Sequence, residues 1–214
     1  MTKAAAGFTG FSTVAFKFFG DLAKNNNREW FHAHKDVYEQ SCRDALKALT
    51  VSLDPPLGAD RLTRINRDMR FARDKSPYHT RISTVVRGCY VSLSADGLYV
   101  GTGLYMPEPP TLRRLREAIA TDASGRKLVS LVAALRRKGY DVGTHESVAS
   151  APRGFSADHP RLDLLRMKDI HAGKMFKPSD AASAKAAQQV RRACEDVAPL
   201  RDWIQRYVGS GRAE

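Results

Sequence analysis

The sequence predicts an α+β fold in which an antiparallel β-meander is flanked by N-terminal and C-terminal helices. Apolar residues recur with a period of 3.6 before residue 55 and again after residue 110, which is typical of amphipathic helices. Between these regions, short runs rich in Val, Ile, Thr and Tyr predict strands. Strands and helices do not alternate, and no glycine-rich phosphate-binding motif occurs, so a dinucleotide-binding fold or a P-loop is disfavoured.

Two helices are expected in the N-terminal part. The first has apolar residues at positions i, i+3, i+4 and i+7, with Ser12 or Thr13 placed to cap its start. These apolar residues are Ala15, Phe18, Phe19 and Leu22. The asparagines at 25–27 interrupt the pattern, because asparagine favours turns and N-caps. A second helix is expected from about Glu29 until the Pro-Pro pair at 55–56 ends it.

The central part predicts strands. Residues 61–66 are compatible with a short strand, and residues 81–93 predict one longer strand in which Gly88 marks a bulge or a close backbone approach. Residues 94–97 predict a hairpin turn, and residues 98–106 predict the returning strand. Because strands joined by so short a loop are antiparallel, this part predicts a meander.

The C-terminal part predicts further helices. Two prolines introduce a helix over residues 109–119, and apolar spacing predicts another over residues 128–135. Residues 139–160 are rich in Gly, Ser and Pro and predict an irregular connection. A short helix is expected over residues 162–167, and the last helix over residues 181–208.

Composition is typical of one domain with an ordinary core. With 43% hydrophobic residues in 214, we expect a single domain over residues 11–208, with flexible ends at residues 1–10 and 209–214. No apolar run is long enough to span a bilayer, and the first residues lack the apolar region of a signal peptide. Three widely spaced cysteines without metal-binding spacing predict reduced thiols. These features predict a cytoplasmic protein without a membrane partner, and they leave the oligomeric state open.

The net charge of +12 makes nucleic acid a candidate partner. Residues 1–109 carry 15 cations and 11 anions, and residues 110–214 carry 20 and 12, so the excess is spread along the chain. A nucleic-acid surface would gather its cations on one face or helix. Charge alone therefore leaves an ordinary solvated surface as the alternative.

The segment from Arg64 to Tyr78 carries the densest chemistry. Four arginines and one lysine stand against two aspartates, interspersed with Ile65, Met69 and Phe71. A concave site with apolar walls and a cationic lining would accommodate both kinds of residue, because buried charges without partners are costly. Guanidinium groups bind carboxylate or phosphate oxygens in bidentate fashion, so a small phosphorylated or carboxylated ligand is expected. The predicted ligand-binding residues are Arg64, Arg67, Asp68, Arg70, Asp74, Lys75, Ser76, Tyr78, Trp30, Gly101 and Gly103.

Two alternatives accompany this prediction. Asp68, Asp74 and Glu29 could neutralise the arginines in a structural ion-pair network in a protein that acts through partners. Gly101 and Gly103 share one face of their strand and would either give room to a packed helix or form a bare floor under a ligand. The sequence leaves the choice open.

Catalytic chemistry is not evident from the sequence. His32 and His34 are not spaced as zinc ligands, and no nucleophile motif occurs, so neither a metal nor a cofactor is expected. The catalytic residues, if any, stay unknown.

Four motifs carry a family resemblance. They are Asn26-Asn-Arg-Glu-Trp-Phe31, His34-Lys-x-x-Tyr-Glu39, Arg64-x-x-Arg-Asp-x-Arg-Phe-x-x-Asp-Lys-Ser-Pro-Tyr78, and Gly101-x-Gly-Leu-Tyr-Met-Pro107 followed by Arg116. Through them the chain resembles the domain of unknown function 2461 family, conserved hypothetical proteins found mainly in bacteria. The resemblance covers nearly the whole chain. It implies no settled activity and no catalytic residues.

Overall fold

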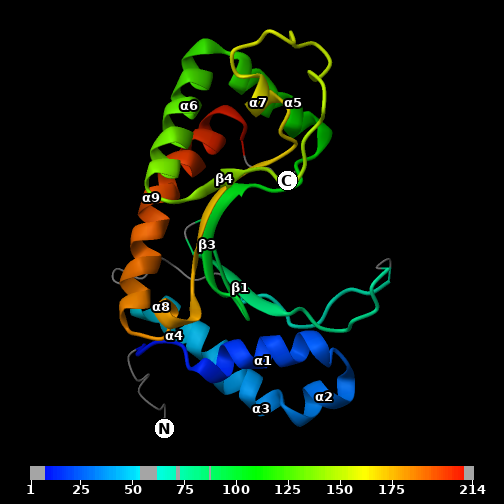
Figure 1. The fold of residues 1–214 in the computed structure, drawn as a ribbon, viewed down its shortest axis with the longest axis vertical. Helices are drawn as coiled ribbons and strands as arrows, with labels where there is room; N and C mark the ends of the chain where they lie inside the picture. Colours follow the sequence, from blue (N-terminus) through cyan, green and yellow to red (C-terminus); the bar gives the residue numbers. More distant parts are fainter. Residues whose placement is uncertain (1–7, 54–61, 71–72, 87, 210–214) are drawn as a thin grey trace. The chain divides into compact units, whose positions relative to one another are not determined.

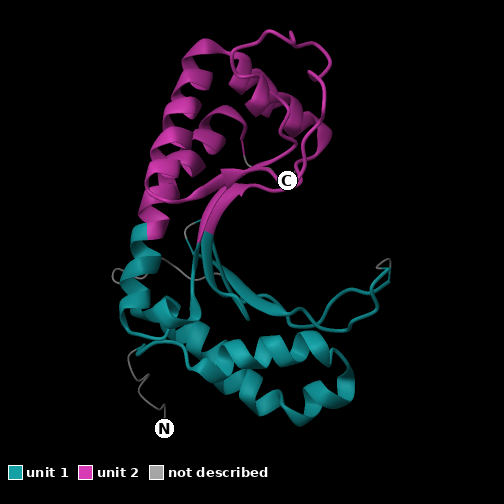
Figure 2. Cartoon of the chain, in the orientation of Figure 1, with its two compact units in different colours: residues 1–100, 175–192 teal, residues 101–174, 193–214 magenta. Residues whose placement is uncertain are grey.

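The computed structural model describes residues 8–53, 62–70, 73–86 and 88–209. Within them lies a five-stranded sheet with the strand order β1-β2-β3-β5-β4 (Figure 1). The α+β prediction is therefore confirmed. The chain divides into two compact units: unit 1 comprises residues 1–100 and 175–192, and unit 2 comprises residues 101–174 and 193–214 (Figure 2). That residues 11–208 behave as one domain stays a prediction.

Unit 1 begins with a set of helices, and its first helix is the one predicted. Ser12 caps α1, since its Oγ accepts a hydrogen bond from the backbone N–H of Val14 at 3.2 Å, and the four predicted apolar residues are buried. Asn27 caps α2 through its Oδ1, which accepts from the N–H of Trp30 at 2.9 Å. The bounds are α1 Thr13–Lys24, α2 Arg28–Ala33, α3 Lys35–Val37, the π-helix η1 Tyr38–Asp44 and α4 Ala45–Ser52.

The expectation of one continuous second helix was wrong. His34 has φ −119° and ψ 14°, outside the helical region, and it separates α2 from α3. A π-helical segment, with its wider turn, then joins α3 to α4. The Pro-Pro pair at 55–56, predicted to end the helix, lies outside the described residues.

The central strands form two successive hairpins. The strand predicted over residues 81–93 is in fact a pair, β1 (Arg81–Val86) and β2 (Cys89–Ser94), with antiparallel register from Arg81↔Ser94 to Val86↔Cys89. Gly88 has φ +74°, so it belongs to the tight turn between them and not to a bulge. The predicted turn before β3 (Gly97–Leu104) is confirmed, and it lies at residues 95–96.

Outside the hairpins, two expectations differ from the structure. Of residues 61–66, those described contribute only the isolated bridge Asn66↔Tyr78, so no strand forms among them. The predicted irregular connection over residues 139–160 contains the short strand β4 (Asp141–Gly143). It pairs antiparallel with β5 (Ile170–Phe176), a strand that the sequence analysis did not predict.

The helices predicted in the C-terminal part are present, but the last begins at Lys185 and not at residue 181, and the short helix Pro178–Ala181 was not predicted. The bounds are α5 Pro109–Ala120, α6 Asp122–Arg137, α7 Leu162–Leu165, α8 Pro178–Ala181 and α9 Lys185–Tyr207. In unit 2 the buried positions of α5 and α6 include Leu115, Ile119, Leu128 and Leu135, which are the positions that the apolar spacing selects. In the described part of the chain, no helix combines the length and apolar composition needed to cross a membrane.

Candidate functional site

The cationic segment of unit 1 forms a loop with a fixed base. We call residues 64–75 the basic loop and residues 76–79, which follow it, its base; residues 71–72, including Phe71, lie outside the described residues. Its two limbs are joined by backbone hydrogen bonds from Arg67 N to Pro77 O (2.9 Å) and from His79 N to Ile65 O (2.7 Å). In Figure 1 the loop is the teal excursion that extends beyond β1.

The base of the basic loop is docked onto the N-terminal helices. The side chain of Asn26 bonds to both backbone groups of Tyr78, with Nδ2 donating to O at 2.9 Å and Oδ1 accepting from N at 3.0 Å. The ring of Tyr78 is buried and stacks on Phe31, with centroids 4.1 Å apart. Trp30 stacks instead on His34, also at 4.1 Å, and contacts Phe18. Trp30 and Tyr78 thus serve the packing of unit 1.

Two ion pairs lie within the basic loop. Arg67 donates to Asp74 and to the backbone carbonyl of Ser76. Asp74 also accepts from the backbone N and the Oγ of Ser76, at 2.9 and 2.6 Å, and these bonds together with Arg67 lower the pKa of its carboxyl. Arg70 donates from Nε and Nη2 to Asp68 at 3.0 and 2.6 Å and lowers the pKa of that carboxyl.

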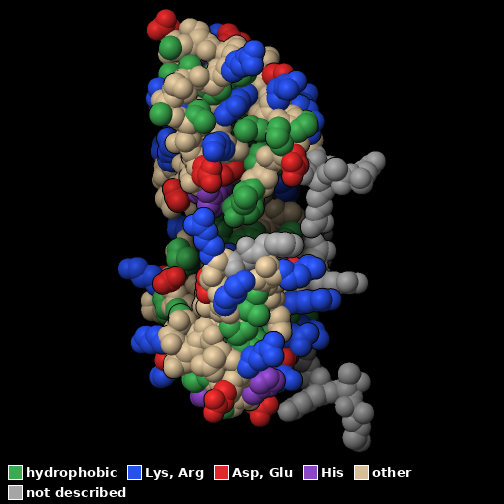
Figure 3. All heavy atoms as spheres, turned by 90° about the vertical axis from the view of Figure 1, so that its right-hand side faces the viewer, with side chains coloured by type: hydrophobic (Ala, Val, Ile, Leu, Met, Phe, Trp, Pro, Cys, Tyr) green, Lys and Arg blue, Asp and Glu red, His purple; other side chains and the backbone are tan. Residues whose placement is uncertain are grey.

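Three cations of the loop have no carboxylate partner among the described residues. They are Arg64, Arg73 and Lys75, all exposed; Lys75 Nζ donates to the backbone carbonyl of Met69 at 3.2 Å. Glu29 forms no ion pair with the described part of the loop, so the predicted neutralisation is limited to Asp68 and Asp74. Lys and Arg side chains are distributed over the face of unit 1 toward which the loop extends (Figure 3).

The electrostatics of the loop base differ from those of its tip. Burial, followed by the charges of Arg67 and Arg81, lowers the pKa of His79 below its ordinary value and so disfavours its charged form. Convergence of Arg64, Arg67, Arg70 and Lys75 on one cavity stays a prediction. Arg70 keeps 78% of its side chain exposed, and Arg67 keeps 25%.

The predicted glycines lie in unit 2. Gly101 is buried. A Cβ on Gly103 would collide with the backbone of β5, meeting the carbonyl oxygen of Ile170 and, at 2.7 Å, the Cα of His171. The lack of a side chain at Gly103 therefore allows β5 to pack closely against β3.

Unit 2 contains a cluster of possible metal ligands that the sequence analysis did not single out. One donor atom each from His145, Asp169 and His171 lies within 4.8 Å of the others. His145 Nδ1 and Asp169 Oδ1 are 3.0 Å apart, and His171 Nδ1 is 3.9 Å from the same oxygen. The backbone N–H of His145 also donates to Asp169 Oδ1 at 3.0 Å.

Strand pairing brings these residues together. The register of β4 and β5 places Gly143 opposite His171. His145 lies two residues after Gly143 and Asp169 lies two residues before His171, so the antiparallel pairing brings these two side chains into contact. This convergence depends on a strand register between segments 24 residues apart, for which the sequence analysis had no signal because neither strand was predicted.

A cavity of about 260 Å³ adjoins this cluster. Its lining comes from the end of β3, from α5 and from both sides of the β4–β5 pair: Tyr105, Met106, Pro107, Leu112, His145, Glu146, Lys168 and Asp169. The ring of Tyr105 meets that of His145 edge-on at 5.0 Å. Met106 has φ 43°, which is uncommon for a residue with a side chain and often accompanies functional sites.

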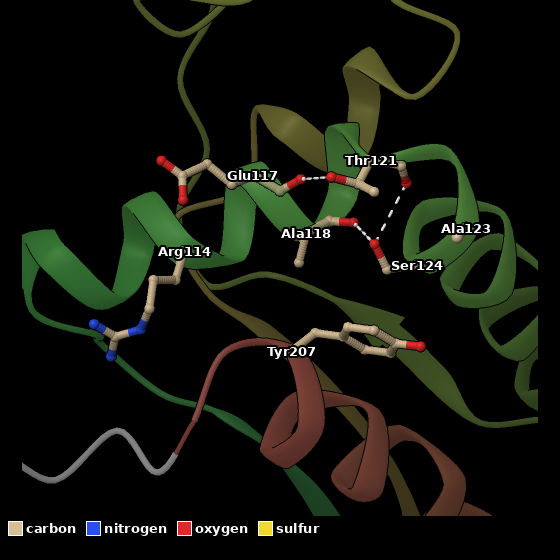
Figure 4. A pocket seen from close by; sticks show the side chains of 7 residues that line it. All are labelled: Arg114, Glu117, Ala118, Thr121, Ala123, Ser124 and Tyr207. Atoms are coloured by element: carbon tan, nitrogen blue, oxygen red, sulfur yellow. Dashed lines mark hydrogen bonds between the residues drawn. The ribbon is translucent and has the colours of Figure 1, made fainter.

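A second cavity in unit 2, of about 370 Å³, lies among α5, the start of α6 and the end of α9 (Figure 4). Several of its polar groups bond to the protein itself. Ser124 Oγ donates to the carbonyl of Ala118 at 2.6 Å, and Thr121 Oγ1 donates to that of Glu117 at 2.9 Å. Arg114 donates to the carbonyl of Val208 at 2.7 Å. These three side chains therefore hold the ends of α5, α6 and α9.

Comparison with known families gives one match. Residues 14–203 match the family described as conserved hypothetical protein (DUF2461). The chain belongs to the DUF2461 family. No curated protein matches the chain.

The motifs through which the sequence resembles DUF2461 proteins fall in both regions described above. Asn26 and Tyr78 join the basic loop to the helices of unit 1. Tyr105, Met106 and Pro107 line the cavity beside the His145 cluster, and Gly103 admits the strand that carries His171. The DUF2461 motifs therefore supply the base of the loop and one wall of the cavity.

Proposed function

We propose that this DUF2461 protein binds the phosphate backbone of a nucleic acid through the basic loop. The observation that supports the proposal is the presence of three exposed cations, Arg64, Arg73 and Lys75, without carboxylate partners among the described residues. Clustered exposed Lys and Arg residues are the electrostatic feature that polyanions recognise. The net charge of +12 favours the approach of any polyanion.

The base of the loop favours binding by limiting the entropy lost on association. Cross-limb backbone bonds and the Asn26–Tyr78 contact hold the loop on unit 1. Donors held in place before binding cost less to order on a ligand. Arg70 is also available, because exposed ion pairs such as Arg70–Asp68 contribute only about 0–1 kcal/mol and exchange readily for a phosphate.

An extended anion fits these observations better than a small one. An enclosed site for a small phosphorylated or carboxylated ligand needs several cations that face one cavity, and the exposure of Arg64 and Arg70 favours an open surface. Other basic runs are poorer candidates. Lys138 pairs with Asp196, and Arg136 donates to the carbonyl of Val142 at 3.0 Å.

The test compares two variants with the same change in charge. Arg64→Gln, Arg73→Gln and Lys75→Gln together remove three charges from the loop. The control carries Arg113→Gln, Lys127→Gln and Arg137→Gln, which remove three exposed charges from α5 and α6 of unit 2. Binding of fluorescent single-stranded and duplex oligonucleotides is measured by anisotropy over a range of salt concentrations.

The loop variant is expected to bind duplex DNA at least tenfold more weakly at low salt. The slope of its log K against log salt concentration should be smaller in magnitude by about 3, because three phosphate contacts are lost. The control should change far less. Equal losses of affinity in both variants would show that binding depends only on net charge, and would refute the loop as the site. Failure of the wild-type protein to bind any oligonucleotide at low salt would refute the proposal as well. Saturable binding of inorganic phosphate alone, abolished in the loop variant, would support the small-ligand site instead.

A further inference from the structure

We infer that His145, Asp169 and His171 form a binding site for one divalent transition-metal ion of the zinc or ferrous type, with an open coordination position toward the adjoining cavity. The three side chains offer two imidazole nitrogens and one carboxylate oxygen. Two histidines with one carboxylate are a common ligand set for catalytic zinc and for non-haem iron.

The distances fit an ion bound among the three atoms. Ligand bonds of about 2.0–2.2 Å in a tetrahedral arrangement place donor atoms about 3.4 Å apart. The separations of 3.0 Å for His145 Nδ1–Asp169 Oδ1 and 3.9 Å for His171 Nδ1–Asp169 Oδ1 lie on either side of this value. All three donor atoms lie within 4.8 Å of one another, so the fold brings the ligands close to the spacing that an ion requires.

An unsatisfied buried nitrogen points to the same site. Nδ1 of His171 is buried and makes no hydrogen bond within the described structure. Buried polar atoms in proteins nearly always have a partner, so such an atom needs an explanation. A cation between His171 and Asp169 would supply the missing partner.

The charge of Asp169 points the same way. Its side chain is only 4% exposed, and among the described residues no Lys or Arg forms an ion pair with it. A buried carboxylate without a cation is costly, and its nearest ionisable partners are the two histidines. A divalent ion bound between His145 Nδ1 and Asp169 Oδ1 would neutralise it.

The surroundings provide the outer contacts and the open side that such sites require. The Nε2 of His171 lies 3.8 Å from a carboxylate oxygen of Asp141, and a carboxylate beside the far nitrogen of a liganding histidine is the usual orienting group. His145 is 52% exposed and lines the cavity. Three protein ligands with one side open are characteristic of catalytic metal sites, whereas structural zinc sites are closed by four.

The experiment uses the full-length protein, dialysed against a chelator and titrated with Zn²⁺ by calorimetry and with Co²⁺ by visible absorption. The ligand variants are His145→Ala and His171→Ala. Two controls are matched to them: His32→Ala removes an exposed histidine of α2, and Glu146→Gln changes the cavity wall without removing a proposed ligand. His145 is half exposed, so its variant should fold even if that of His171 is destabilised.

The wild-type protein is expected to bind one Zn²⁺ per chain, to gain thermal stability with it, and to give the intense visible spectrum of Co²⁺ in a low-coordinate site. Each ligand variant should lose at least tenfold in affinity, and both controls should bind as the wild type does. The inference is overturned if the folded wild-type protein binds neither ion saturably, or if His145→Ala and His171→Ala bind with unchanged affinity. The loop variant with three glutamines should retain the ion, since its changes lie in unit 1.

Discussion

The side-chain amide of Asn26 pairs with both backbone groups of Tyr78, in the way that a neighbouring strand would. Oδ1 of Asn26 accepts from Tyr78 N at 3.0 Å, and its Nδ2 donates to Tyr78 O at 2.9 Å. The two residues are 52 positions apart, and Tyr78 is 5% exposed. One amide therefore attaches the end of the basic loop to the connection between α1 and α2.

Replacing Asn26 by alanine should destabilise the protein by about 1–2 kcal/mol, because it leaves a part-buried backbone donor and a part-buried backbone acceptor of Tyr78 unpaired. The control is Asn25→Ala, which removes one exposed side-chain hydrogen bond to the carbonyl of Asp21 and should cost much less. Urea unfolding measures both. Equal costs for the two variants would show that the amide pairing contributes little.

Gly103 and Gly143 flank the same residue of β5 and should respond differently to alanine. A Cβ on Gly103 would overlap the backbone of Ile170 and His171, whereas the nearest atom to a Cβ on Gly143 is His171 Cε1 at 4.0 Å. Gly103→Ala should lower the free energy of unfolding by about 1–3 kcal/mol, and Gly143→Ala should change it by no more than about 0.5 kcal/mol. If the inferred metal site exists, Gly103→Ala should also weaken zinc binding. Unchanged stability in Gly103→Ala would contradict the close strand approach.

Arg161 joins two helices from a buried position. Its side chain is 7% exposed and donates to the carbonyls of Ile119 and Ala120, each at 2.7 Å, and to Asp122 at 2.9 Å. Arg161→Ala should cost about 3 kcal/mol, because buried carbonyls lose their partners. Arg126→Ala, which removes an exposed i,i+4 pair with the same aspartate, should cost no more than about 0.5 kcal/mol. Thermal unfolding compares the two.

The same contacts predict that the stability of the fold decreases at acidic pH. Hydrogen bonds from Arg161 and then Arg126 lower the pKa of Asp122 below its ordinary value of 3.8. A lowered pKa in the folded state means that the contribution to stability is present above about pH 4 and is lost as the pH falls through the folded-state pKa. Asp122→Asn should therefore reduce the loss of stability between pH 5 and about 3. An unchanged acid profile in this variant would rule out the contribution.

The burial of Cys42 predicts that the stability of the fold decreases at alkaline pH. Its thiol is buried, and burial raises its pKa from 9.0 to about 12. Above pH 9 the unfolded chain releases this proton while the folded chain keeps it, so stability should fall with pH by up to about 1.4 kcal/mol per pH unit. Unfolding free energies measured between pH 8 and 10 should decline less steeply in Cys42→Ala. Parallel declines in variant and wild type would contradict the prediction.

Local periodicity predicted α1, α5 and α6 but not the break at His34, and the missed strands depend on pairing across the chain. The apolar spacing of α1, α5 and α6 determines which face is buried, so their positions could be read from the sequence. The strand β5 could not, because its residues Ile-His-Ala-Gly-Lys-Met-Phe lack the alternation and β-branched content of an ordinary strand. The turn at Gly88 resembles a bulge in sequence, because both use glycine at positive φ.

The candidate sites also differ in whether the sequence alone could predict them. The density of charge in the basic loop is visible in the sequence, and so are the two aspartates that pair with Arg67 and Arg70. The His145 cluster is not, because its members become neighbours only through the register of two unpredicted strands. The expectation that no metal binds rested on the spacing of His32 and His34, which lie elsewhere in the fold.

The division of unit 1 into two stretches of chain constrains how this protein can fold as it leaves the ribosome. Its first stretch ends at residue 100, but Phe11 N donates to the carbonyl of Ala181 at 3.0 Å. A Cβ at Gly10 would also overlap the backbone of Ala182, so the two segments pack closely. Domains usually complete their folding in the order of synthesis, at about 5–20 residues per second. Unit 1 instead has to wait for residues 175–192, through the whole time in which residues 101–174 are made. A nascent chain released before that point lacks the carbonyl of Ala181 to which Phe11 N donates, and we expect it to be more open to chaperones and proteases.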